Sequence, residues 1–280
     1  MRLGWFRKGG LAECAKIFTK MGKLKDYGEV KRAQYVLELS ELRKHDRLDS
    51  DEPTGEDCDR VIGIQIAAEM KAKCPNLALG CVEAEVTTGA APTGLEEALR
   101  GYEERIAKLP EPRAVLEAAA IVATRAGYKV LGKDPARYRG SAEALLRRLI
   151  AAKGMPRINN VVDVINLVSV ESRMPIGLYD AARVEGEIEF RVGGAGETYK
   201  GIGKYDLNLE GLPVFADALG PHGSPTSDSE RTMVAEGTKR VLAIMVSFGG
   251  AAVLESAMMR MKELLEAHAA ASALSSWIVS

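Results

Sequence analysis

The segment from Pro156 to Asp180, PRINNVVDVINLVSVESRMPIGLYD, decides how this sequence folds. Between Asn160 and Glu171 the apolar residues surround nearly the whole circumference of a helix, a pattern typical of a buried helix. Three polar residues interrupt that pattern: Asn159, Asp163 and Asn166 are spaced at i, i+4 and i+7, so they share one stripe. The segment therefore predicts a buried central helix with one polar stripe.

A polar stripe on a buried helix needs partners. Burying an amide or a carboxylate without a hydrogen bond costs about 1–3 kcal/mol. The stripe therefore faces either a polar cleft that takes a ligand or the backbone of neighbouring loops. The sequence leaves both interpretations open, with Asn166 the nearest of the three to the turn at 175–177.

Outward from this helix the sequence alternates between helical and extended patterns. Helices are predicted over residues 93–109, where Thr93 and Glu96 suggest a capping box, and over 112–125, 141–153 and 251–268. Strands are predicted over residues 77–86, 187–192, 197–202, 213–216, 231–235 and 241–248. Because helices and strands do not alternate strictly, we expect a mixed α/β layered domain, with a central mixed sheet flanked by helices, and not a Rossmann unit.

The N-terminal part differs in composition. Two amphipathic helices are predicted over residues 10–21 and 27–44, and an acidic stretch broken by Pro53 follows over 46–62. We therefore divide the chain into an N-terminal extension with an acidic linker, residues 1–62, and a main domain, residues 63–280.

Composition excludes several classes of protein. The 280 residues carry a net charge of −1, and no apolar run is long enough to span a membrane. The start of the sequence lacks the apolar stretch of a signal peptide, so a cytoplasmic protein is expected. Four cysteines without a CxxC pair and three scattered histidines predict no metal site, and no cofactor is expected.

Charge is concentrated in one part of the sequence. Residues 121–160 contain nine basic and two acidic side chains, a local charge of +7. Such a block is typical of a surface that contacts nucleic-acid phosphates, although a solvated charged surface has the same composition. The residues expected to bind RNA are Lys129, Lys133, Arg137, Arg139, Arg147, Arg148, Lys153 and Arg157.

The segment NNVVDVINLVSVESRMPIGLYD resembles the signature of the B3/B4 domain of the bacterial phenylalanyl-tRNA synthetase β subunit, which removes misattached tyrosine from its tRNA. The likeness continues through EIEFRVGGAGE at 187–197 and FAD at 215–217, and covers about residues 64–268. It implies a mixed α/β domain with a deep pocket between two sub-parts. It also implies aminoacylated tRNA as the partner and hydrolysis of the ester of a mischarged tRNA.

The resemblance carries over to individual residues in part. Asn166 corresponds to the family's helix asparagine and Pro175 to its pocket proline. The family's editing histidine is replaced by Gly177, and its later pocket glycine and glutamate by Pro225 and Ile244. The resemblance therefore implies the pocket without its selectivity for tyrosine.

The polar segment from His222 to Thr232 offers replacements for the missing groups. His222 or Asp228 could act as a base, and Arg231 could polarise a carbonyl, so the expected catalytic residues are these three together with Asn166. The expected substrate pocket comprises Asn159, Asn160, Asp163, Pro175, Gly177, Ser227 and Thr232.

Two functions follow from this reading. The first is a free-standing aminoacyl-tRNA deacylase that hydrolyses mischarged tRNA. The alternative is a non-catalytic tRNA-binding module with the same fold. A small-molecule binder that reuses the amino-acid pocket is a third, weaker reading, because the basic block favours RNA.

Overall fold

Helix α7 (Asn160–Ser172) is the buried helix that the sequence predicts, and nine of its 13 residues are buried. The computed structural model describes residues 61–203 and 206–280. The helix begins after Asn159, whose side-chain oxygen accepts a hydrogen bond from the Val162 amide over 2.9 Å. It ends at Arg173, which adopts a left-handed conformation with φ 66°. The helix is therefore capped by local polar groups at its start and by a backbone turn at its end.

The strands form two four-stranded sheets and a small two-stranded ribbon. The first sheet is antiparallel throughout, in the order β10 (Ser272–Val279), β2 (Ala78–Glu85), β9 (Arg240–Ser247) and β3 (Ile176–Asp180). The second sheet has the order β1 (Ile64–Ile66), β4 (Ile188–Val192), β7 (Pro213–Asp217) and β8 (Gly220–Gly223), with β1 parallel to β4. The ribbon pairs β5 (Thr198–Lys200) with β6 (Asp206–Asn208).

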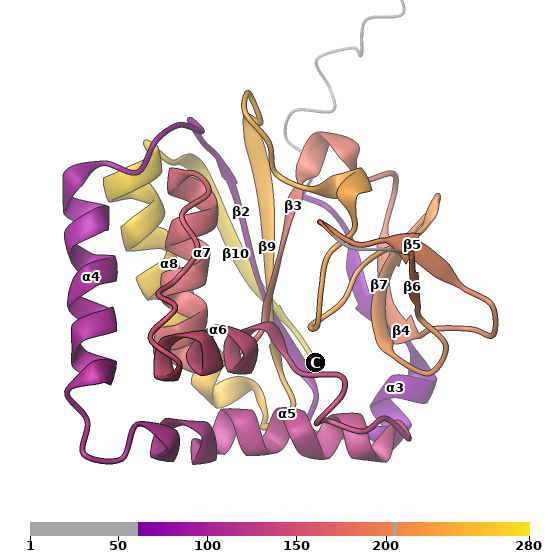
Figure 1. Cartoon of the computed structure of the whole chain (residues 1–280). Helices are drawn as coiled ribbons and strands as arrows, with labels where there is room; N and C mark the ends of the chain where they lie inside the picture. The colour runs from indigo at the N-terminus through magenta and orange to yellow at the C-terminus, as the bar shows by residue number, and fades with distance from the viewer. Residues whose placement is uncertain (1–60, 204–205) are drawn as a thin grey trace, which may run out of the picture. The chain divides into compact units, whose positions relative to one another are not determined.

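Helices cover one face of the first sheet. Besides α7, the α-helices within residues 61–203 and 206–280 are α3 (Ala68–Lys73), α4 (Thr93–Ala107), α5 (Ala119–Val130), α6 (Ser141–Ile150) and α8 (Leu254–Ala269). Short 3₁₀ turns are η1 (Pro112–Glu117), η2 (Ala181–Arg183), η3 (Glu230–Thr232) and η4 (Ala251–Val253). Figure 1 shows α4, α6, α7 and α8 on one side of the first sheet and the strands β4 and β7 on the other. No helix in the described parts of the chain is long and apolar enough to cross a membrane.

Strand β9 shows how the layers are held together. Its side chains alternate between the faces of the sheet, so Ala243 and Met245 belong to the helical core while Leu242 and Ile244 belong to the core shared with the second sheet. All four residues are fully buried. The first sheet is therefore the middle of three layers.

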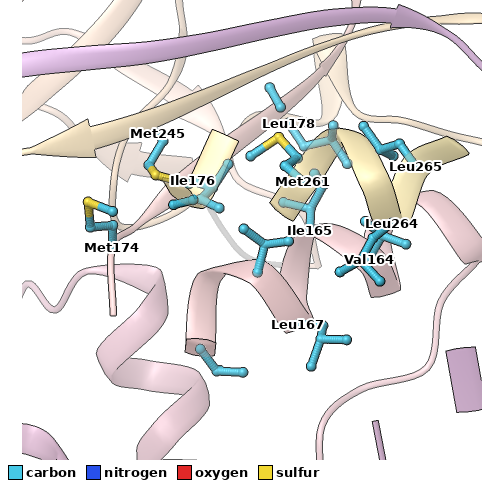
Figure 2. Packing of buried hydrophobic residues seen from close by; sticks show 14 of the residues in the cluster. Val164, Ile165, Leu167, Met174, Ile176, Leu178, Met245, Met261, Leu264 and Leu265 are labelled. Carbon is cyan, nitrogen blue, oxygen red and sulfur yellow. The ribbon is translucent and has the colours of Figure 1, made fainter. Parts of the chain in front are cut away.

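The helical core is filled mainly by aliphatic and methionine side chains. Ile165 of α7 lies among Met261 of α8, Met245 of β9 and the neighbouring residues that Figure 2 labels. Met258 and Met261 of α8 are buried in this core, whereas Met259 is exposed. Unbranched methionine fills irregular gaps between helix and sheet, which explains its use here.

The mixed α/β fold class is confirmed, with strands in two sheets where one central sheet was expected. The strand predicted over 231–235 is wrong: Ser229 accepts a hydrogen bond from the Arg231 amide and starts the 3₁₀ turn η3 instead. The capping box at Thr93 is also wrong. The Pro92 carbonyl already accepts the amides of Leu95 and Glu96, so the helix starts one residue earlier than that box requires.

Other predictions at helix ends need adjustment. Helix α6 begins after Gly140, so Ser141 is its first residue and not its cap. The helix predicted over 112–125 is broken at Ala118 into η1 and α5. The helices predicted over 10–21 and 27–44 lie outside the described residues, as does nearly all of the acidic linker, and the proposed domain boundary stays a prediction.

Asn160 ties three segments together at the start of α7. Its side-chain oxygen accepts the Gly89 amide over 2.8 Å, and its amide group donates to the carbonyls of Thr87 and His268 over 2.9 Å each. We predict that Asn160→Ala lowers the free energy of unfolding by about 2–4 kcal/mol, because it leaves three backbone groups without partners. Urea denaturation measures this.

Asn208→Ala is the matched control. Asn208 is exposed and accepts one hydrogen bond, from the Glu210 amide over 2.9 Å. Its loss should cost less than about 1 kcal/mol. Equal effects of the two substitutions would contradict the anchoring role of Asn160.

Candidate functional site

Three buried tyrosine hydroxyls hold the loop between β8 and η3. The tyrosines come from three elements that are far apart in the sequence. Their hydrogen bonds join Tyr128 of α5 to Thr226 over 2.6 Å, Tyr179 of β3 to Asp228 over 3.0 Å, and Tyr199 of β5 to Ser224 over 3.1 Å. The polar segment that the sequence singles out is therefore tethered to the body of the domain.

Tyr179 lies between the two sheets, with its hydroxyl enclosed by two glycines. A Cβ atom added at Gly177 of β3 would lie 2.1 Å from the Tyr179 hydroxyl oxygen, and one added at Gly223 of β8 would also lie 2.1 Å from it. Both distances are far below van der Waals contact. Any other residue at position 177 would need the Tyr179 ring to move.

Asp228 is the polar partner of that tyrosine. One carboxylate oxygen accepts the Tyr179 hydroxyl, and the other accepts the Leu178 amide over 3.3 Å. Burial, and then the negative charge of Asp228, hold the pKa of Tyr179 well above its ordinary value. The phenol therefore stays protonated and donates to Asp228, which here anchors a loop.

His222, one of the two expected bases, is buried. Its ring packs edge-on against the Tyr179 ring with centroids 4.6 Å apart, and its Nδ1 lies 3.3 Å from the Thr232 hydroxyl oxygen. Its Nε2 has no hydrogen-bond partner in the described part of the chain. Burial lowers the pKa of His222 to about 4, against an opposing effect of Asp217, so the imidazole is neutral at pH 7. It is 0% exposed, so a substrate cannot reach it without rearrangement.

Arg231 forms a bidentate ion pair with the buried Asp217. Its guanidinium donates to the two carboxylate oxygens of Asp217 over 2.8 and 3.0 Å, and to the Gly220 carbonyl over 3.2 Å. Burial alone would raise the pKa of Asp217, but hydrogen bonds from Arg231 and from the Glu185 amide bring it below its ordinary value. Arg231, the cation expected to polarise a substrate carbonyl, thus already has a carboxylate partner.

The polar stripe of α7 divides into two kinds of residue. Asn159 caps the helix, and Asp163 accepts the Ile158 amide over 2.9 Å, so both satisfy neighbouring backbone as the structural interpretation expects. Burial raises the pKa of Asp163 against the lowering effects of that amide and Arg157. Asn166 is half-buried and makes no side-chain hydrogen bond within the described residues.

The remaining pocket residues are spread over two places. Ser227 lies in the loop between β8 and η3 (residues 224–229), which we call the tethered loop, and Thr232 ends η3. The Ser227 carbonyl accepts the Ser224 hydroxyl over 2.8 Å. Pro175 instead borders a small hollow of about 10 Å³. The residues that line this hollow are Ile121, Thr124, Gly140, Ala142, Glu143, Arg173 and Pro175.

Four of the nine basic residues at 121–160 serve the fold itself. The buried Glu143 accepts Arg125 over 3.0 Å and Arg147 over 2.8 Å. Arg157 pairs with Glu96 and Glu103 over 3.0 Å each, and Arg148 donates to nearby carbonyls. These arginines therefore already have internal partners.

Four of the other five cations lie at or just after the C-terminal end of α5, and the fifth, Lys153, is exposed after α6. Lys129, Lys133, Arg137 and Arg139 have no ion-pair partner among residues 61–203 and 206–280. The Lys133 ammonium and the Arg137 guanidinium lie 5.5 and 5.4 Å from the centre of the Tyr138 ring. We call these four residues with Tyr138 the α5 basic tip.

Sequence reasoning missed Tyr179, Tyr128 and Tyr199, which organise the site. One available signal was the spacing of Gly177 and Tyr179, because residues two apart in a strand share a face. The other was Asp217, which lies in the FAD segment as a carboxylate in a buried strand and so requires a cation partner.

We predict that Gly177→Ala lowers the free energy of unfolding by about 1–3 kcal/mol, because the new methyl group overlaps the Tyr179 hydroxyl. In a Tyr179→Ala background the same substitution should cost almost nothing, and a double-mutant cycle measures this coupling. Gly101→Ala is the control, since no atom lies within 4 Å of its added Cβ and alanine favours the helix. Additive costs at positions 177 and 179 would contradict the overlap.

We predict that Arg231→Gln destabilises the protein by about 1–3 kcal/mol at neutral pH, because Asp217 loses a charged partner. The pKa of Asp217 is lower in the folded protein than its ordinary value, so the full stability difference between wild type and variant is present above pH values near 4, the ordinary carboxyl pKa. This stability difference shrinks as the pH falls through the pKa that Asp217 has in the folded protein. Lys200→Gln, which removes an exposed ion pair with Glu230, should have little effect at any pH. A pH-independent difference for Arg231→Gln would refute this account.

Comparison of the sequence with known proteins identifies a family. The family described as the B3/4 domain matches residues 123–268, more than half of the chain. The phenylalanine–tRNA ligase beta subunits of Paramagnetospirillum magneticum and Brucella abortus are 34% and 31% identical to it over 83 residues. That match spans 29% of this chain and 10% of each relative, so the chain matches about a tenth of the length of these relatives.

A solved structure shows a weaker similarity. The match is to an N-terminal fragment of the phenylalanyl-tRNA synthetase beta subunit from Pyrococcus horikoshii. It covers 79% of this chain and 51% of that fragment, with 14% sequence identity and a TM-score of 0.40. The family match rests on the sequence of residues 123–268, which contains α7, the tethered loop and the α5 basic tip. This chain belongs to the B3/4 domain family.

Proposed function

We propose that this chain is a tRNA-directed protein in which the B3/4 fold binds aminoacylated tRNA without hydrolysing it. The observation that carries the proposal is the α5 basic tip, which combines four cations that have no ion-pair partner in the described residues with a half-exposed aromatic ring. Cations neutralise backbone phosphates, and an aromatic ring stacks on an unpaired base. Membership of a family that includes parts of tRNA ligases supports tRNA as the nucleic acid.

The condition of the expected catalytic groups supports binding over hydrolysis. Arg231 is paired with Asp217, Asp228 accepts the Tyr179 hydroxyl, and His222 is sealed from solvent. A group that stabilises a transition state must be free to meet the charge that develops on the substrate. The position where the family resemblance implies a histidine is Gly177, and the space beside it is filled by Tyr179.

We predict that replacing Lys129, Lys133, Arg137 and Arg139 with glutamine weakens tRNA binding at least tenfold at about 0.15 M salt. Each lost phosphate contact should also reduce the slope of log affinity against log salt by roughly one unit. Filter binding or fluorescence anisotropy over a salt series measures both quantities. The fold should be retained, because these four side chains form no ion pair within the described residues.

The control must remove equal charge elsewhere. The exposed cations outside the α5 basic tip include Arg100, Arg105, Arg113 and Lys239, and replacing these four with glutamine should leave affinity within about twofold. Arg147 is unsuitable as a test, because its loss also removes a partner of the buried Glu143. Equal weakening by the two sets would show that net charge alone drives binding and would contradict a local site.

The deacylase remains the second candidate, favoured by Asn166. Its half-buried amide makes no hydrogen bond within the described residues, so it could donate to a carbonyl or hold a water molecule. The test is incubation of the purified chain with a panel of mischarged tRNAs, for which the binding proposal expects no enzyme-dependent loss of the amino acid. If hydrolysis occurs, Asn166→Ala should slow it by about 10²–10³ with tRNA affinity retained, and the binding-only proposal is then wrong.

A further inference from the structure

Strand β10 forms one edge of the first sheet (Figure 1). It pairs with β2 on one side, and on its other side its backbone has no partner within the described part of the chain. The strand at the opposite edge of this sheet, β3, is buried at all five positions, whereas no residue of β10 is fully buried. Since alternate residues of an edge strand direct their N–H and C=O groups outward, β10 presents an open row of hydrogen-bonding groups.

This edge lacks the features that usually keep sheet edges apart. Natural edges are protected by charged side chains, by proline or by being short. From residue 269 to residue 280 the chain contains no charged residue and no proline, and β10 is eight residues long. The outer strands of the second sheet are shorter, since β1 has three residues and β8 has four. Among the described edge strands, β10 is therefore the best suited to accept an added strand.

A bulge limits the part of β10 that can pair regularly. The register with β2 shifts between Ser272 and Ser275, and Ala273 has a left-handed backbone with φ 48°. A bulge bends its strand and interrupts the ladder of hydrogen bonds. The regular part of the edge is therefore Ser275–Val279.

The regular part carries apolar side chains that the described chain covers only in part. Trp277 and Val279 pack at the margin of the core between the two sheets, and both remain partly exposed. Ile278 lies on the other face of the strand and is 37% exposed. A strand added at this edge would bring side chains beside all three residues and cover apolar surface on both faces.

We propose that the added strand is β10 of a second copy of this chain, paired antiparallel about a two-fold axis at Trp277. This register pairs the whole regular part of both copies. It places Ser275 opposite the partner's Val279 and Ser276 opposite the partner's Ile278. Because the strand is neutral throughout, pairing with itself brings no like charges together, so the edge is complementary to its own copy. The two-fold axis uses up both edges and closes the assembly at a dimer.

The inference stands apart from the conclusions above. Strand β10 lies outside residues 123–268, which the B3/4 domain family matches, so a dimer through this edge does not follow from membership of the family. It is also independent of the proposed RNA binding, since this edge carries no cation.

Sedimentation velocity of the full chain over micromolar concentrations tests the dimer. The wild type should move from the mass of one chain to that of two. Ser276→Lys should weaken this association at least tenfold, because Ser276 is exposed and the two introduced ammonium groups become diagonal neighbours across the axis. Ser272→Lys is the matched control. It adds the same charge at an exposed residue of the bulged end, outside the paired part, and should change the association by less than about twofold.

A charge swap separates a lost interface from a damaged fold. Ser276→Glu should also be monomeric by itself, since it places two carboxylates across the axis. A mixture of the Ser276→Lys and Ser276→Glu chains should form dimers that contain one chain of each. Mixing cannot repair a defect inside one chain, so this rescue depends on the two strands meeting at Ser276.

Several outcomes would overturn the proposal. They are a wild type that keeps the mass of one chain, growth beyond two chains, a dimer that Ser276→Lys does not weaken, and equal weakening by Ser272→Lys. Circular dichroism checks that each variant is folded. If neither charged variant folds alone, their mixture should still fold as a dimer, because association stabilises the folded state. Failure of the mixture to dimerise would overturn the proposal in either case.

Discussion

The burial of β9 on both faces is the constraint on which the rest of the structure depends. Ala243 and Met245 need a helical layer on one side, and Leu242 and Ile244 need a second layer on the other. Since a strand alternates its side chains with a period of two, neither layer can be lost without exposing half of the strand. The helices and the second sheet are thus both required by one strand.

This three-layer arrangement determines where polar groups can lie. Between the two sheets, the rings of Tyr179, Phe215 and Phe190 pack among aliphatic side chains such as Leu242 and Ile244, so the interface between the sheets is apolar. A charged group that enters this interface needs a partner, because an unpaired charge in a low-dielectric region is strongly unfavourable. Arg231 and Asp217 form an ion pair with one another, and Asp228 accepts a hydrogen bond from the Tyr179 hydroxyl. The polar residues of the segment from His222 to Thr232 therefore serve to pair buried polar groups, and their presence alone does not indicate a catalytic site.

The sequence predicted the layers better than the site because the two depend on different information. Helix α7 and strand β9 have strong local patterns, and both lie within a residue of their expected ends. The short strands β3 and β8 were missed, since Ile176–Asp180 and Gly220–Gly223 are too short to show a period. The segment at 231–235 looks extended locally, but Ser229 and Asp217 hold it in another conformation. Pairing between distant residues such as Tyr179 and Asp228 has no local signature at all.

The same reasoning separates charges that belong to the fold from charges that belong to a surface. In sequence the cations between 121 and 160 look alike, yet Arg125 and Arg147 converge on the buried Glu143 while Lys133 and Arg137 flank an aromatic ring. An arginine whose guanidinium is already held by a carboxylate gives little net field to a distant phosphate, because the pair is nearly neutral. A lysine or arginine without such a partner keeps its full charge at the surface. The surface charge of this domain therefore depends on which of its cations have internal partners. The density of basic residues in the sequence overstates the positive surface that is available to a nucleic acid.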